Sequence, residues 1–324
     1  MKTLAPFRRH LLAVALLGLG TVGAMAPTRA AAPMLKTQAP GYYRFMLGDF
    51  EITALSDGTL ALPVDKVLHT QPERVQAALR DQHISLPAET SVNAFLINTG
   101  SKLVLVDAGA GTLWGPTAGK LLASLKAAGY MPEQVDEVYI THLHTDHIGG
   151  AVANGAPVYA NAIVRADQRE VDYWLSKAHA AAAPAGDQGT FQGAVASMEP
   201  LLEARRFKAF SGDTDLVPGV RAVAAHGHTE GHTVYLVESQ GQKLYLIGDL
   251  IHVGAVQFPN PTVTIISDTD RKLAREQRMS TFSRAAREGA MIGAAHLSFP
   301  GVGYLKTAGQ GYQWIPINYS ALNK

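Results

Sequence analysis

The segment Thr141–Gly150, THLHTDHIGG, places three histidines and one aspartate within six positions. It directly follows the apolar run of DEVYI, residues 136–140, which we predict to be a buried strand. Imidazole and carboxylate groups are ligands that Zn²⁺ and similar cations accept. Because a rigid strand aims the side chains at its end toward one place, this cluster predicts a metal site.

Three later segments carry further metal-type ligands at the ends of predicted strands. A chain without cysteine must hold a metal through His, Asp or Glu. With the first cluster, these segments supply enough histidines and aspartates for two metals. The segments are AHGHTEGH with His226, His228 and His232, GDLIH with Asp249 and His252, and GAAH with His296.

Length and composition narrow the classes of protein. The 324 residues are 47% hydrophobic, which suffices for one large domain with a substantial core, and no linker divides them. A net charge of +1 gives no electrostatic case for nucleic-acid binding. The absence of cysteine excludes disulfides, a thiol nucleophile, a zinc finger and an iron–sulfur cluster.

The first thirty residues have the pattern of an export signal. A positive segment with Arg8 and Arg9 precedes the apolar run LLAVALLGLG, and small residues allow cleavage after Ala30. We therefore expect a signal peptide over residues 1–30, one domain over 31–324, and a periplasmic or secreted protein without stable membrane insertion. FRRHLL also resembles a twin-arginine signal, and a retained N-terminal anchor is the alternative.

The remaining sequence predicts alternating strands and helices. Residues 41–62 suggest two strands around a Ser56–Gly58 turn, and residues 93–109 a hairpin. Helices are expected near residues 117–129 and 167–179, and an amphipathic helix with acidic caps over 268–290. Residues 180–189, AAAAPAGDQG, are expected to form a mobile loop.

The motifs together resemble the metallo-β-lactamase superfamily. THLHTDH fits its H-x-H-x-D-H motif, and VDAGAG, GHTEGH, GDLIH and AAH occur in the superfamily's order. The resemblance covers about residues 41–320 and implies an αββα sandwich, an α/β fold of two mixed sheets flanked by helices. Segments such as KAAGYMPEQVDEVYITH and GAAHLSFPG are similar to methyl parathion hydrolases and their relatives.

The resemblance also implies a ligand assignment for two divalent metals, with Zn²⁺ as the expected ion. Asp249 bridges the two ions, and His228 rather than His232 is the ligand of GHTEGH. Asp107 of VDAGAG orients a ligand histidine or, alternatively, caps a turn. The role of His226 stays open. The first metal is assigned to His142, His144 and His228, and the second to Asp146, His147 and His296.

By the same resemblance, the protein hydrolyses organophosphate triesters and also aryl esters and lactones, through attack of a metal-bridging hydroxide. His252 stands where metallo-lactonases carry a tyrosine donor, so it is a candidate to hydrogen-bond the substrate; simple packing is the alternative. Small neutral substrates and a homodimer are implied. The catalytic candidates are Asp146, Asp249 and His252; the pocket candidates are Trp114, Trp174 and Phe191, with Phe258 and Phe299 as further ones.

Other functions fit the residues less well. The main alternative is a lactonase or arylesterase with weak or no phosphotriesterase activity. A β-lactamase commonly has cysteine where Asp249 stands, and a di-iron redox protein usually has a carboxylate where His144 stands. Glutathione thioester hydrolysis and RNA processing call for basic surfaces, and a decayed metal-binding scaffold predicts missing ligands.

Overall fold

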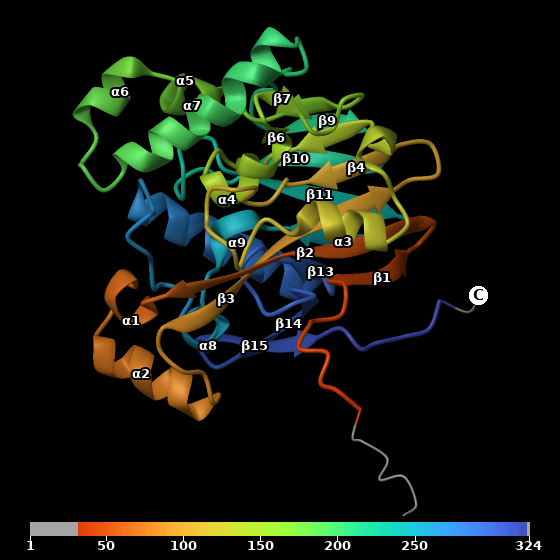
Figure 1. Cartoon of the computed structure of the whole chain (residues 1–324). Helices are drawn as coiled ribbons and strands as arrows, with labels where there is room; N and C mark the ends of the chain where they lie inside the picture. Colours follow the sequence, from red (N-terminus) through yellow and green to blue (C-terminus); the bar gives the residue numbers. More distant parts are fainter. Residues whose placement is uncertain (1–31, 323–324) are drawn as a thin grey trace, which may run out of the picture. The chain divides into compact units, whose positions relative to one another are not determined.

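Two β-sheets face each other in the structure, a computed structural model that describes residues 32–322 (Figure 1). The first sheet has six strands in the order β1-β2-β3-β4-β5-β8. β1 to β4 pair antiparallel, and β4, β5 and β8 pair parallel. Its strands are β1 Tyr42–Leu47, β2 Phe50–Leu62, β3 Ala88–Asn98, β4 Leu103–Val106, β5 Glu137–Tyr139 and β8 Ile163–Arg165.

The second sheet has seven strands in the order β15-β14-β13-β12-β11-β10-β9. All neighbours are antiparallel except β12 and β13. A small ribbon joins β6 Val152–Ala153 to β7 Ala156–Pro157. The strands of the second sheet are β9 Thr214–Val217, β10 Val220–Ala224, β11 Thr233–Ser239, β12 Gln242–Leu246, β13 Met291–Gly293, β14 Val302–Ala308 and β15 Gly311–Pro316.

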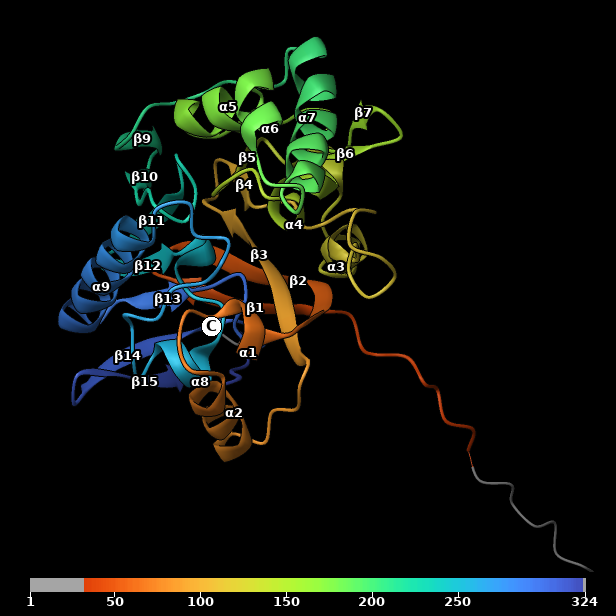
Figure 2. The same ribbon diagram turned by 90° about the vertical axis from the view of Figure 1, so that its left-hand side faces the viewer.

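Helices cover the outer faces of both sheets. Figure 2 shows α3 beside the first sheet and α9 beside the second. The main helices are α3 Leu121–Ala127, α7 Gln188–Glu203 and α9 Arg271–Glu288. The others are α1 Val64–Val67, α2 Pro72–Asp81, α4 Thr145–Ile148, α5 Gln168–Trp174, α6 Lys177–Ala182 and α8 Gly254–Gln257, with 3₁₀ turns η1 Pro132–Gln134, η2 Gly149–Ala151 and η3 Gly248–Leu250.

The hydrophobic core follows this layering. On β3, Phe95 and Ile97 belong to the cluster between the sheets, whereas Leu96 packs into the cluster under α3 and α7. Phe282 of α9 lies in a third cluster, against the far face of the second sheet. Strands that are apolar on both faces require cover on both sides. The predicted αββα fold is confirmed.

The expected turn at Ser56–Gly58 is wrong. The chain turns earlier, at Gly48 and Asp49, and Ser56–Gly58 lies inside β2 as an irregularity in its pairing with β3. Asp57 does not close a turn there. Its buried carboxylate accepts hydrogen bonds from the backbone N–H groups of Ala110, Gly119 and Leu121, at 2.9–3.0 Å.

The region 167–189 contains more helical residues than expected, and these residues are divided among more helices. The helix predicted near 167–179 is two helices, because Ser176 caps α6 by accepting a hydrogen bond from the His179 N–H. The loop predicted over residues 180–189 is right over only half of its length, because five of its ten residues are helical. The alanine run extends α6 to Ala182 and α7 begins at Gln188, so only five residues, 183–187, connect the two.

The C-terminal helix α9 begins as predicted, with Asp270 accepting a hydrogen bond from the Leu273 N–H. Its buried face is not wholly apolar, since Arg278 lies among Ala274, Phe282 and Ala285. The expectation of an ordinary amphipathic helix is therefore only partly right.

The N-terminal part of the chain is described from residue 32. Residues 32–38 contain no helix or strand, and the compact unit begins at Ala39. The expected signal peptide lies outside the described residues. No helix among residues 32–322 combines the length and apolarity needed to cross a membrane.

Candidate metal centre

The four predicted ligand segments converge at the ends of strands. Thr141–His147 follows β5, His228 lies between β10 and β11, Asp249 follows β12, and His296 follows β13. Their imidazole rings touch, with centroids 4.1 Å apart for His142 and His147 and 4.8 Å for His142 and His228. The convergence expected from the sequence is therefore present in the fold.

A first His/Asp group gathers His142, His144, His228 and Asp249. Each residue offers one ligand atom, and these atoms lie within 4.8 Å of one another. His144 Nδ1 is 2.9 Å from His142 Nε2 and 3.2 Å from His228 Nε2. Three imidazole nitrogens and one carboxylate oxygen form a tetrahedral type of donor set that suits Zn²⁺.

A second His/Asp group gathers Asp146, His147 and His296 within the same limit. Asp146 Oδ2 lies 3.7 Å from His147 Nε2 and 3.5 Å from His296 Nε2. All three residues are buried. The group supplies three donors, so a metal held by it could accept a further donor from outside the group, as a catalytic site requires.

Asp249 lies between the two groups. Its Oδ1 is 3.1 Å from both His147 Nε2 and His296 Nε2, whereas Oδ2 is 3.2 Å from His228 Nε2 and 3.6 Å from His142 Nε2. Oδ1 thus faces the second group and Oδ2 faces the first, although Oδ2 also lies 3.2 Å from His296 Nε2. A carboxylate placed in this way can bridge two ions. The glycine at position 248 allows this close packing next to Asp249, since a Cβ at that position would lie only 2.7 Å from His232 Nε2 and clash with it.

Outer hydrogen bonds orient the imidazoles. His147 Nδ1 donates to Asp107 Oδ2 at 2.9 Å and His228 Nδ1 to Asp268 Oδ1 at 2.8 Å. His296 Nδ1 donates to the Ser91 carbonyl at 2.9 Å. With the proton held on Nδ1, the Nε2 lone pair points at the centre. Asp107 thus touches a ligand-type histidine and also receives the Thr141 N–H at 2.8 Å.

The residues at the centre fit a cation. Among the described residues, His147 Nε2 and Asp249 Oδ1 are buried without a hydrogen-bond partner, although they lie only 3.1 Å apart. Burial lowers the pKa of His142 well below its ordinary value, and His147 lowers it further. Burial alone would raise the pKa of Asp249, but the surrounding histidines hold it well below its ordinary value. Against the effect of burial, Asp249 raises the pKa of His147, His228 and His296, so a cation would compete with protons at these three nitrogens. Neutral imidazole and ionised carboxylate are the forms that bind metals.

Two nearby histidines do not join these groups. His232 is fully buried, and its Nε2 accepts the Asp249 N–H at 3.1 Å, so it holds the backbone of the bridging residue. Burial, with the charge of His228, lowers the pKa of His232 to about 3. His226 Nε2 lies 3.8 Å from Asp167 Oδ2, outside both groups.

His252 lies close to the centre. Its Nε2 is 3.1 Å from Asp249 Oδ2, and its ring stacks on that of His296 with centroids 5.1 Å apart. Asp249, His252 and His296 also form a possible ligand set by distance. The side chain is buried but lines a cavity, so it faces both the centre and any bound substrate.

A cavity of about 460 Å³ opens over the centre. The three predicted pocket residues line it: Trp114 is 42% exposed, whereas Trp174 and Phe191 are largely buried, with ring centroids 4.6 Å apart. Phe258 and Phe299 are not among its lining residues; Phe258 packs on Trp314 instead. None of the described residues that line the cavity is lysine or arginine.

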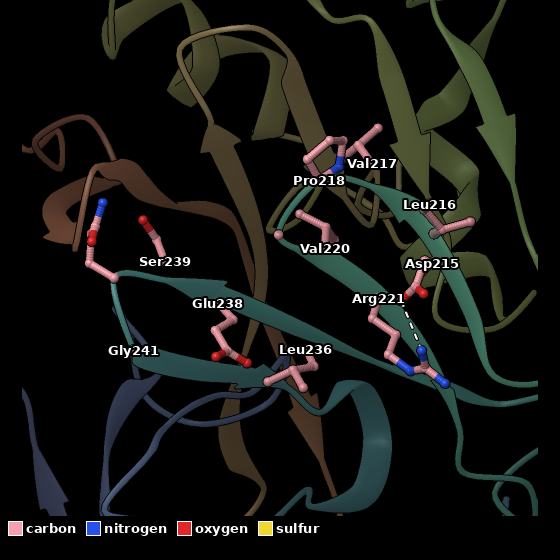
Figure 3. Close-up of a pocket in the computed structure, with 12 residues that line it drawn as sticks. Asp215, Leu216, Val217, Pro218, Val220, Arg221, Leu236, Glu238, Ser239 and Gly241 are labelled. Carbon is pink, nitrogen blue, oxygen red and sulfur yellow. Dashed lines mark hydrogen bonds and ion pairs between the residues drawn. The ribbon is translucent and has the colours of Figure 1, made fainter.

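A larger hollow, of about 710 Å³, lies along the strands β9, β10 and β11 and the turn that follows β11 (Figure 3). Its lining includes no member of the two His/Asp groups. Arg221, which is half-buried, is paired there with the exposed Asp215 at 2.9 Å. The smaller cavity is therefore the one where chemistry can occur.

Asp268 was missed by the sequence analysis. It was expected to belong to the acidic start of α9, but it accepts from His228 and from the Ile265 N–H. No spacing links it to GHTEGH, forty positions earlier, so only the fold reveals the contact.

Comparison with known proteins identifies the family of the chain. It matches the sequence model of the metallo-beta-lactamase superfamily over residues 87–296. A crystal structure of the hydrolase AbOPH, in the beta lactamase superfamily, is similar with a TM-score of 0.84 and 37% identity, covering 88% of this chain and 100% of that one.

AidC, a dizinc quorum-quenching lactonase, is similar with a TM-score of 0.80 and 26% identity, covering 87% of this chain and 99% of that one. An N-acyl homoserine lactonase of Bacillus cereus is 28% identical over 130 residues, which is 40% of this chain and 43% of that protein. The chain thus spans about two fifths of the curated relatives it matches. Its fold, its site geometry and the family match show that it belongs to the metallo-beta-lactamase superfamily.

Proposed function

We propose that the protein is a binuclear metal-dependent hydrolase of lactones and aryl esters. The observation that carries this proposal is the pair of His/Asp groups sharing Asp249 at the floor of a cavity that also has aromatic and aliphatic walls. Aromatic and aliphatic walls without a cationic side chain favour small neutral substrates over anionic ones. The similarity to AidC and to N-acyl homoserine lactonases supports lactones in particular.

Two Zn²⁺ ions are the proposed cofactors. The first is assigned to His142, His144 and His228, the second to Asp146, His147 and His296, and Asp249 is shared. Bound divalent ions supply Lewis acidity, which polarises a carbonyl or phosphoryl oxygen and lowers the pKa of water.

The chain's own residues position the substrate and move a proton. Trp114, Trp174 and Phe191 hold the apolar part of the substrate and exclude water. Asp146, whose carboxylate is 11% exposed against 3% for Asp249, reaches the cavity and orients the attacking water. His252 is assigned to hydrogen-bond the carbonyl or the departing oxygen, because an alkoxide leaving group needs a donor.

Phosphotriester hydrolysis of the methyl parathion type is the second candidate. It was the principal prediction from the sequence, and a cavity whose lining has aromatic walls and no lysine or arginine suits a triester as well as a lactone. The comparisons add no support for it, so lactone hydrolysis takes first place. Export to the periplasm and a homodimer remain part of the proposal, on the sequence pattern and the resemblance alone.

The test is a comparison of kcat/KM on zinc-loaded protein lacking residues 1–30, with dihydrocoumarin, an N-acyl homoserine lactone and methyl parathion. A lactone preferred a hundredfold or more over methyl parathion corresponds to about 2.7 kcal/mol of discrimination and supports the proposal. Preference for the phosphotriester refutes the lactone assignment but leaves the hydrolase intact. No hydrolysis of any of the three refutes both candidates.

A further inference from the structure

Glu170 is a fully buried carboxylate on α5, outside both His/Asp groups. We infer that Glu170 is a positioning residue that holds two ligand-bearing loops against each other. This inference rests on the proposed metal centre. These are the His142–His144 loop after β5 and the His228–Gly231 loop after β10. Neither the motifs nor the spacing of the sequence pointed to this residue.

The hydrogen bonds of Glu170 divide between the two loops. Oε2 accepts the Leu143 N–H at 2.9 Å, and Leu143 lies between the ligand-type residues His142 and His144. Oε1 accepts the Gly231 N–H at 2.7 Å and a short hydrogen bond from the Thr229 hydroxyl, next to His228. One carboxylate thus ties together the neighbours of all three histidines of the first group.

The contacts require a carboxylate of this length. All three partners are donors, and an ionised carboxylate has only acceptors. A glutamine would turn its NH₂ group toward one of the donors, and an aspartate is one methylene too short to reach both loops. Burial raises the pKa of Glu170, while the bonds from Thr229, Leu143 and Gly231 oppose that rise.

Glu170 is not needed to start its own helix. Asp167 does that, because its carboxylate accepts the Arg169 N–H and also the Gly212 N–H, each at 2.8 Å. The second loop instead approaches α5 very closely: a Cβ on Gly231 would lie 2.8 Å from the Glu170 nitrogen. The helix also carries Trp174, whose ring is 5.3 Å from that of His144. The helix, the loops and one pocket wall therefore form one unit around the first group.

The test compares Glu170→Gln with Asp57→Asn as a matched control. Asp57 is also a buried carboxylate that accepts three backbone N–H bonds, but its donors adjoin no ligand residue. The measurements are Co²⁺ affinity, the cobalt absorption spectrum, and thermal unfolding, all on protein lacking residues 1–30. Loss of an outer partner of a metal site typically costs about 10–100-fold in affinity.

We expect Glu170→Gln to weaken Co²⁺ binding at one of the two sites by about 10–100-fold and to change the spectrum. Asp57→Asn should lower the unfolding temperature but keep the wild-type spectrum and stoichiometry. If Glu170→Gln fails to fold, Thr229→Val removes one donor with little change in volume, and a smaller loss of affinity in the same direction is expected.

The inference is overturned if the folded Glu170→Gln variant, or Thr229→Val in its place, binds two cobalt ions with wild-type affinity and spectrum. A wild-type chain that binds no cobalt refutes the metal centre and this inference together. A wild-type chain that binds cobalt but hydrolyses no lactone refutes only the proposed substrate, because the role of Glu170 is tested by metal binding and not by hydrolysis.

Discussion

Arg278 of α9 holds the segment with Pro261 and Val263, which leads into the cavity-lining residues 265–269. Fully buried, it donates to the carbonyls of Leu250, Pro261 and Val263, and Nη2 lies 3.9 Å from Asp268 Oδ2. Replacing Arg278 by methionine keeps much of the buried stem and removes the guanidinium. We expect a large loss of stability and a looser segment.

The size of the loss follows from these contacts. The Val263 carbonyl keeps a hydrogen bond from the Gln257 side chain, but those of Leu250 and Pro261 lose the guanidinium. A buried polar group left unpaired costs about 1–3 kcal/mol. With the loss of the cation near Asp268, the total is about 3–5 kcal/mol. At about 2 °C per kcal/mol for a chain of this size, the unfolding temperature should fall by roughly 6–10 °C.

The assay is thermal unfolding of the zinc-loaded protein followed by circular dichroism. Arg275→Met, on the exposed side of the same helix, is the control and should change stability by no more than about 0.5 kcal/mol. Equal unfolding temperatures for Arg278→Met and the wild type would show that the buried guanidinium does not hold the segment.

Two further substitutions test the site. Asp107→Asn keeps a side chain that tolerates the positive φ of 63° at this position, but it weakens the acceptor of the hydrogen bond from His147 Nδ1. Metal affinity should therefore fall about 10–100-fold in a chelator competition titration. Unchanged affinity would contradict the role of Asp107. His252→Leu removes the proposed donor, so kcat/KM should fall more for an N-acyl homoserine lactone, which releases an alkoxide, than for methyl parathion, which releases an activated phenoxide. Equal falls would refute a specific role for His252.

The layered fold and the converging ligands could be predicted from the sequence, because their signals are local. The ligand motif occupies six consecutive positions, and each further segment ends an apolar run. The outer partners gave no such signal. Glu170 and Asp268 reach donors 27 to 61 positions away in the sequence, so only the fold brings them together.

The errors came from side chains whose partners are distant. Asp57 in Ser-Asp-Gly favours a turn locally, yet its carboxylate is held by backbone groups 53 to 64 positions further on. Arg278 occupies the buried face of α9 because carbonyls of another segment accept its protons. Ser176 caps α6 and so divides the predicted helix in two, and the pattern of apolar residues did not predict this break.

The most direct test of the central claim is a measurement of metal content together with dihydrocoumarin hydrolysis. Protein lacking residues 1–30 is stripped with a chelator and titrated with Zn²⁺, while bound zinc and kcat/KM are followed in parallel. We predict that stripped protein is inactive, that two ions bind per chain, and that activity returns with them. Full hydrolysis by the stripped protein would contradict the assignment of catalysis to the paired His/Asp groups.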